Sequence, residues 1–222
     1  MNDPEHIKHI LEENNLGIKL DIGCGANKQP GFVGIDNRDL PGVDIVWNVE
    51  LFPWPLPDGC ASLCMASHLL EHIDPHGGDA RVAPLVKLLI DKGLVTTEEI
   101  KTVMGNYDPG PKFLAFMDEC WRILKPDGQF MIAVPYAGST GYFQDPTHVN
   151  PINEVTWAYF DPLEPNTDGQ LYRIYEPKPW KIGPSAWNQF GNIETLLIKR
   201  REDNSYFTDP AKKDYSKGGV TS

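Results

Sequence analysis

The stretch LDIGCGANKQPGFVGIDN, from Leu20 to Asn37, contains the pattern that decides the fold. An apolar run that carries an acid ends in a Gly-Cys-Gly turn, and a second apolar run ends in Asp36. Glycines at positions 23 and 25 let the backbone turn tightly after a strand and approach a ligand closely. An acid at the end of the following strand can accept both hydroxyls of a ribose. The stretch is therefore typical of a nucleotide-binding α/β protein.

The spacing within this stretch discriminates between nucleotides. A dinucleotide site needs a helix directly after the glycines, with its N-terminus at the pyrophosphate, and an acid about 20 residues further on. Here only ANKQPG separates Gly25 from Phe32, and Pro30-Gly31 would break any helix started there. The spacing predicts a ligand that carries a ribose but no pyrophosphate.

The periodicity along the rest of the chain predicts alternating strands and helices. A helix is expected from Asp3-Pro4 to about Gly17, and another over 111–124, where apolar residues form one broad face. Short apolar strands are expected at about 18–23, 32–36, 44–49, 61–67 and 129–136. Residues 180–190 and 192–200 look like an antiparallel pair. We therefore expect an α/β fold with a doubly wound, mostly parallel seven-stranded sheet and a C-terminal antiparallel hairpin.

The expected organisation is one domain over residues 1–200, followed by a polar tail over 201–222. A helical insertion over about 75–110 exceeds the minimal connection between two strands, and includes a capping box at Thr96 and Glu99. This insertion is either a lid over a substrate, with His76, Asp79 and Arg81 as contacts, or a structural addition.

Composition narrows the class of protein. The chain has 222 residues and a formal net charge of −11. This negative charge argues against a nucleic-acid partner bound through many phosphate contacts. The longest apolar run falls short of the roughly 18 residues of a membrane span. Its four cysteines form no CxxC pair, so reduced thiols in the cytoplasm are expected and a zinc site is not. Oligomeric state cannot be inferred.

Several motifs in order resemble one known family. GCGANKQPGFVGID, DIVWNVELFPWPLPDGCASLCMASHLLEHI, WRILKPDGQFMIAVP and DPTHVNP are similar to segments of class I S-adenosylmethionine-dependent methyltransferases. The match is closest to a small single-domain branch with GCGxxKxPGFxGxD, LEH and DPTH motifs, and it covers about residues 16–160. The resemblance implies S-adenosyl-L-methionine as cofactor and a methyltransferase activity.

The resemblance also implies roles for individual residues. The methionine part of the cofactor would be bordered by Asp21 and the Gly23–Gly25 turn, which includes Cys24. The ribose would lie on Asp36, with Asn37 beside it. Asn48 would meet the adenine edge together with the backbone of Val49. Relatives usually have Asp at the position of Asn48, but an Asn side-chain oxygen can also accept a hydrogen bond.

Other candidate residues lie at the expected carboxyl ends of strands, where ligands of open α/β sheets bind. Ser67 and His68 end the fourth strand and are candidates for cofactor or substrate contact. Asp145 and His148 follow the fifth strand, where they either cap the next helix or act on an acceptor, His148 as a general base. Catalytic roles are thus expected for His148, Asp145 and His68.

The remaining candidates have structural alternatives. Tyr136 and Tyr142 flank the same crevice and are candidates for substrate contact only. Trp54 is expected to pack in a proline-rich loop, and Glu71 and His72 to fix a helix start.

The expected reaction is an in-line transfer of methyl to an oxygen or nitrogen of a small-molecule or sugar acceptor. Because the sulfonium methyl is already activated, neither a catalytic triad nor a metal is expected. Two alternatives stay open: a nicotinamide oxidoreductase, which the spacing disfavours, and a non-catalytic protein that retains the fold for binding or assembly.

Overall fold

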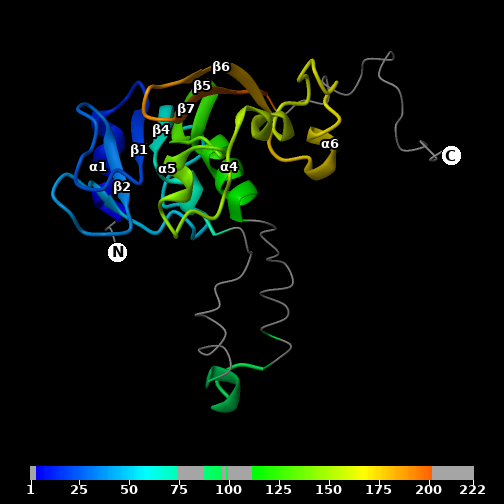
Figure 1. Cartoon of the computed structure of the whole chain (residues 1–222). Helices are drawn as coiled ribbons and strands as arrows, with labels where there is room; N and C mark the ends of the chain where they lie inside the picture. Colours follow the sequence, from blue (N-terminus) through cyan, green and yellow to red (C-terminus); the bar gives the residue numbers. More distant parts are fainter. Residues whose placement is uncertain (1–3, 75–87, 97–98, 100–111, 202–222) are drawn as a thin grey trace.

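The computed structural model describes residues 4–74, 88–96, 99 and 112–201 (Figure 1). Its centre is a seven-stranded sheet in the order β3-β2-β1-β4-β5-β7-β6. The strands are β1 (Ile18–Ile22), β2 (Val33–Asp36), β3 (Ile45–Val46), β4 (Ala61–Ser67), β5 (Leu124–Pro135), β6 (Trp180–Trp187) and β7 (Asn192–Lys199).

The strand directions confirm the predicted fold class. The first five strands pair in parallel, and β7 pairs antiparallel with both β5 and β6. From β1 the chain winds outward through β2 and β3, then returns to the other side of β1 for β4 and β5. This is the order of doubly wound nucleotide-binding sheets, whose ligands bind where the winding reverses. The expected C-terminal hairpin is formed by β6 and β7.

The core lies between the sheet and helix α4 (Lys112–Ile123). Phe116, Met117 and Cys120 of α4 are fully buried, as the predicted apolar face requires. Phe130 of β5 lies 6.4 Å from Phe116, centroid to centroid. Helix α1 (Pro4–Glu13) adds Ile7 and Ile10 to the same core.

Three strands differ from their predicted lengths by more than one residue, and one of them, β6, ends at Trp187 rather than at 190. The strand expected at 44–49 is only the two-residue β3, because the chain turns at Asn48: the Asn48 side-chain oxygen accepts from Glu50 N and its carbonyl from Leu51 N. Strand β5 begins at Leu124, earlier than expected, and includes the KPDG turn as an irregularity in which Asp127 has a φ of 62°. The strands themselves lie where the apolar runs predict.

The connection from β1 to β2 contains no helix in any of its residues 23–32, as the spacing predicts. The face of β4, β5 and β7 that points away from α4 is also open. Met65, Met131 and Leu196 line a cavity of about 490 Å³ there, and Met131 is 47% exposed. Within the described ranges, the sheet is thus covered more thinly on one face than is usual for parallel sheets.

Shorter elements complete the described part. They are the 3-10 helices η1 (Leu70–His72) and η2 (Glu154–Tyr159), the helical turns α5 (Thr140–Phe143) and α6 (Tyr172–Tyr175), and a helical stretch at 88–91 within the predicted insertion. The predicted capping box is present: Glu99 N donates to Thr96 Oγ1, and Thr96 N donates to a Glu99 carboxylate oxygen. Over the described residues, none of the helices combines the length and apolar character that crossing a bilayer requires. Most of the predicted insertion, with His76, Asp79 and Arg81, and the tail from 202 lie outside the described residues.

Candidate functional site

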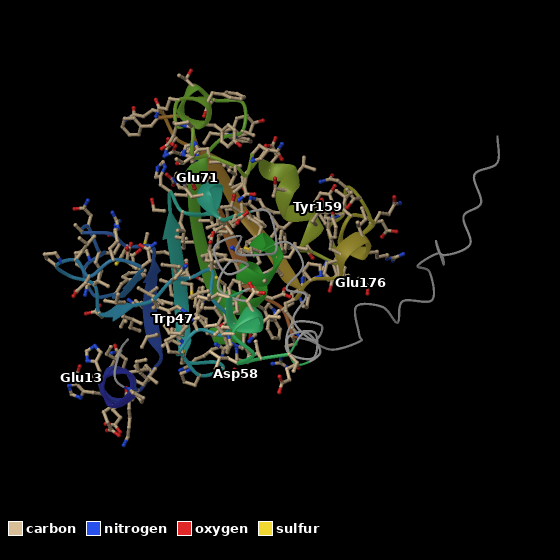
Figure 2. The ribbon with its side chains drawn as sticks, turned by 90° about the horizontal axis from the view of Figure 1, so that it is seen from below. Glu13, Trp47, Asp58, Glu71, Tyr159 and Glu176 are labelled. Atoms are coloured by element: carbon tan, nitrogen blue, oxygen red, sulfur yellow. The ribbon has the colours of Figure 1, made fainter. Side chains whose placement is uncertain are left out.

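A cavity of about 400 Å³ opens at the carboxyl ends of β1, β2 and β4. This is the edge of the sheet where the winding reverses, and the volume is within the range of small-molecule sites. Figure 2 labels Glu71, in the turn η1 that follows β4, on the side of the molecule where α5 lies. We call this cavity the first cavity. Its lining residues are Gly23, Asp36, Asn37, Arg38, Asn48, Val49, His68, Leu69 and His72.

Three carboxylates hold the loop from Gly23 to Gly31 in place of a helix. Asp21 Oδ2 accepts from Gln29 N at 2.9 Å, and Asp36 Oδ2 accepts from Gly25 N at 2.9 Å. Asp44 Oδ2 accepts from Gly34 N at 2.7 Å and pairs with Lys28 Nζ at 2.6 Å. Each of these three carboxylates thus satisfies one backbone amide of the loop region, and other loop amides donate to backbone carbonyls such as Ile35 O.

Asp36 lies at the end of β2 and is 5% exposed. Its Oδ1 accepts from Arg38 N at 3.0 Å and from Arg38 Nε at 3.2 Å. Burial opposes ionisation, but the hydrogen bonds from Arg38 and Gly25 outweigh it, and the pKa of Asp36 is lowered. The side chain is therefore a carboxylate at neutral pH, able to accept hydroxyl groups.

Asp21 and Cys24 are directed into the loop rather than into the cavity. Burial raises the pKa of Asp21, and the bond from Gln29 N offsets this only in part. Burial likewise raises the pKa of Cys24 to about 11. The Cys24 sulfur would lie 2.7 Å from a Cβ at Gly34, so the thiol packs beneath the loop. Both side chains help to shape the turn.

Asn48 and Val49 form the wall opposite the glycine turn. The Asn48 side-chain oxygen accepts from Glu50 N, as in a turn former, yet Asn48 also lines the cavity. Val49 O accepts from Trp54 Nε1 at 3.0 Å. Trp54 is 2% exposed and its ring packs on Phe116, in agreement with the packing role expected for it.

A second cavity of about 520 Å³ adjoins the first. His68 and His72 line both cavities, so the two spaces share a wall. The second cavity, as we call it, is polar: three histidines, a carboxylate and two amides face it. Its lining residues are His68, His72, Pro135, Gly141, Gln144, Asp145, His148, Phe190 and Asn192.

His68 has a left-handed backbone, with a φ of 53°, at the end of β4. A non-glycine residue in this region is uncommon, and such strain concentrates at functional sites. Asn192 Nδ2 donates to His68 Nε2 at 3.0 Å, so the ring proton lies on Nδ1, 3.3 Å from Glu71 Oε1. This contact lacks hydrogen-bond geometry for Glu71, and it becomes an ion pair only when His68 takes up a second proton. The proximity of Glu71 raises the pKa of His68, and partial burial opposes the rise.

Asp145 and His148 lie in the turn after α5, and the next helix, η2, is capped by Asn153 rather than by Asp145. Asp145 Oδ1 accepts from Thr147 N and Thr147 Oγ1, which lowers the pKa of Asp145. Both residues nevertheless line the second cavity. His148 donates from Nδ1 to Tyr142 O at 2.7 Å, and its Nε2 lies 3.8 Å from Asp145 Oδ2.

The structure brings most predicted site residues together. Gly23, Asp36, Asn37, Asn48 and Val49 line the first cavity, Asp145 and His148 line the second, and His68 lines both. Asp21, Cys24, Gly25 and Ser67 are not among the lining residues, although Gly25 N binds Asp36. Tyr136 stacks edge-on against Trp187, and the Tyr142 ring lies 5.4 Å from that of His148.

Sequence reasoning missed several lining residues. Arg38 lies two residues after the predicted ribose acid, so its spacing could have indicated it. His72 was expected only to fix a helix start. Phe190 and Asn192 come from the β6–β7 turn, and no local pattern places that turn beside β4.

No protein-family model matches the chain, and no curated protein sequence matches it either. Among solved structures, the chain is similar to the 16S rRNA (adenine(1408)-N(1))-methyltransferase from Catenulisporales acidiphilia, at 10% identity and a TM-score of 0.44, covering 90% of this chain and 96% of that one. It is also similar to a SAM-dependent methyltransferase from Archaeoglobus fulgidus, at 14% identity and a TM-score of 0.44, covering 89% and 95%. A SAM-dependent methyltransferase from Aquifex aeolicus has 14% identity and a TM-score of 0.43, covering 89% and 99%. The function of this chain is inferred from its own residues.

Proposed function

We propose that the chain is an S-adenosyl-L-methionine-dependent methyltransferase that binds the cofactor in the first cavity and a small-molecule or sugar acceptor in the second. One observation carries the proposal: a cavity with a ribose-competent carboxylate and a helix-free glycine turn shares a wall with a histidine-lined cavity. A methyl donor and an acceptor must meet across such a wall.

The cofactor assignment rests on the first cavity. The ribose hydroxyls would bind Asp36, displacing the side chain of Arg38, which is 65% exposed and therefore easily moved. Gly23, with a φ of 70°, lets the backbone approach the methionine part closely. The adenine edge would lie at Asn48 and Val49, where the second lone pair of the Asn48 oxygen can still accept. The motif resemblance supports the same placement.

The absence of a helix in residues 23–32 favours this cofactor over a dinucleotide. A pyrophosphate is normally held by the first turn of a helix that follows the glycines. Here that place is taken by a loop whose amides are directed at Asp21 and Asp36. A ligand without phosphates suits this environment better.

The polar second cavity suits an acceptor that offers an oxygen or nitrogen. His68 stands at the shared wall, where its Nε2 could take the proton of the attacking group, and His148 and Asp145 face the same space. The transfer would be an in-line displacement, and holding nucleophile, methyl and sulfur in line can contribute about 7–11 kcal/mol to lowering the barrier.

Isothermal titration calorimetry with S-adenosylmethionine, S-adenosylhomocysteine and NAD tests the cofactor assignment. We expect binding of the first two and none of NAD; binding of NAD alone would refute the proposal. Radiolabelled methyl donor offered with pools of sugars, small metabolites and RNA then tests for transfer. Cofactor binding without transfer to any pool would favour a non-catalytic protein that retains the fold.

A further inference from the structure

A cluster of metal-binding side chains lies against the second cavity. One ligand atom each from Glu71, His72 and His148 can be chosen so that all lie within 4.8 Å of one another. We propose that this cluster binds a divalent first-row transition metal ion. The set was not expected from the sequence, because 76 positions separate His72 from His148.

Glu71 is the strongest indication of a missing ligand. It is 0% exposed, and neither of its carboxylate oxygens has a hydrogen-bond partner among the described residues. A buried, unpaired carboxylate is costly unless a charge or a metal ion compensates it. The His68 contact at 3.3 Å serves only one of the two oxygens and lacks hydrogen-bond geometry.

In both histidines of the cluster, Nδ1 is hydrogen-bonded and Nε2 is the nitrogen left to bind a metal ion. His148 Nδ1 can only donate to Tyr142 O, which leaves Nε2 with a free lone pair. Thr147 Oγ1 donates to Asp145 Oδ1, so it accepts from His72 Nδ1, and the lone pair of His72 is also on Nε2. Metal-binding histidines usually donate their other nitrogen to a carbonyl or a similar partner in this way.

The spacing around His148 suits an ion better than a direct contact. His148 Nε2 lies 4.0 Å from Glu71 Oε1 and 3.8 Å from Asp145 Oδ2, too far for hydrogen bonds. Two ligands that each lie about 2.0–2.2 Å from one ion are at most about 4.4 Å apart, so three atoms that lie within 4.8 Å of one another need to move together by only about 0.4 Å.

Backbone contacts hold the two halves of the cluster together. Glu71 O accepts from both Val149 N and Asn150 N, at 2.8 and 3.1 Å. Asn150 Nδ2 donates to Leu70 O and Ile73 O. The segment after His148 is therefore fastened to η1, so the ligands are positioned before any ion binds.

Two imidazoles and one carboxylate favour Zn²⁺, Co²⁺ or Fe²⁺ over Mg²⁺ or Ca²⁺, which prefer oxygen ligands only. The inference concerns metal binding by the apo chain and does not depend on the proposed methyl transfer. If the metal-binding test fails, the proposed methyl transfer is unaffected, and the converse also holds.

The test uses full-length, tag-free protein stripped with a chelator and titrated with Co²⁺ and Zn²⁺ by absorption spectroscopy and calorimetry. We expect one equivalent of Co²⁺ to bind with d–d bands, to be displaced by Zn²⁺, and not by equimolar Mg²⁺. His148→Gln, His72→Gln and Glu71→Gln should each weaken binding at least about 10–100-fold. Thr147→Val, which removes the partner of His72 Nδ1, should weaken it about 10-fold or more.

His9→Gln is the matched control, because His9 is an exposed histidine on α1, paired only with Glu13. It should bind like the wild type. Circular dichroism checks that each variant is folded. If Glu71→Gln does not fold, the metal affinity of His72→Gln provides the test instead. No tight binding by the wild type, equal binding by folded His72→Gln and His148→Gln, or a preference for Mg²⁺ would overturn the inference.

Discussion

Replacing Asp36 with Asn changes the group on which the cofactor assignment depends most. The side chain keeps its shape and one acceptor oxygen, but it loses its charge and gains an NH₂ group. In the wild type, Oδ2 accepts from Gly25 N and Oδ1 from Arg38. A bound ribose would use the charge that the lowered pKa of Asp36 maintains.

The size of the effect follows from the bonds lost. A hydrogen bond to a charged group contributes about 1.5–3 kcal/mol, and Asn can replace only one of the two carboxylate acceptors. Losing one charge-assisted bond to the ribose corresponds to about a 10- to 150-fold weaker affinity for S-adenosylmethionine. The Arg38 pair itself contributes little, because Arg38 is largely exposed.

Calorimetry of the wild type and of Asp36→Asn measures this difference, with circular dichroism to establish that the variant is folded. Asp39→Asn is the control, since it makes the same charge change at an exposed position three residues further on. We expect Asp39→Asn to bind like the wild type. A folded Asp36→Asn whose affinity changes less than about threefold would refute the ribose role.

Three further substitutions test the surrounding structure. Burial raises the pKa of Asp21, so ionised Asp21 costs stability at neutral pH. Asp21→Asn should therefore have a melting temperature equal to or above that of the wild type at pH 7–8, and the difference should shrink as the pH falls toward the raised pKa. Thermal melts from pH 4 to 8 measure this difference. Gly34→Ala would place a Cβ 2.7 Å from the Cys24 sulfur, costing about 1–3 kcal/mol by overpacking; chemical denaturation should show this cost, and Cys24→Ala in the same chain should recover part of it. Glu119 binds Arg122 at 2.6 Å and is 7% exposed. Glu119→Gln should therefore lower the free energy of unfolding by about 1.5–3 kcal/mol, as measured by chemical denaturation. An unchanged denaturation midpoint would contradict the importance of this pair.

Most of the fold could be predicted because its signals are local. The strand β4 occupies the predicted residues Ala61–Ser67, and α4 begins and ends within one residue of the apolar stripe. The absence of a helix between β1 and β2 was also predictable, because the connection is short and contains Pro30-Gly31. Strand β3 is shorter than expected because Asn48 diverts the chain, and the apolar pattern of DIVWNV does not report a side-chain hydrogen bond.

The site could be predicted only in part, for a related reason. Asp36 and His68 end strands, and strand ends meet at one edge of a parallel sheet. The approach of Glu71 to His148 depends instead on Val149 and Asn150 binding the carbonyl of Glu71. Such a contact joins segments far apart in the chain, and neither segment has a pattern that reports the other.

The carboxylate-held loop between β1 and β2 has an electrostatic consequence. Where a helix would present positive amide ends, this chain places Asp21 and Asp36 beneath its turn, and the cations beside them, Lys28 and Arg38, are each paired with a carboxylate. The local potential therefore disfavours polyanions and attracts positively charged molecules, since charges at such edges act over several ångströms. For the proposed sulfonium cofactor, which carries a positive charge, we therefore expect binding at this edge to weaken as the ionic strength rises.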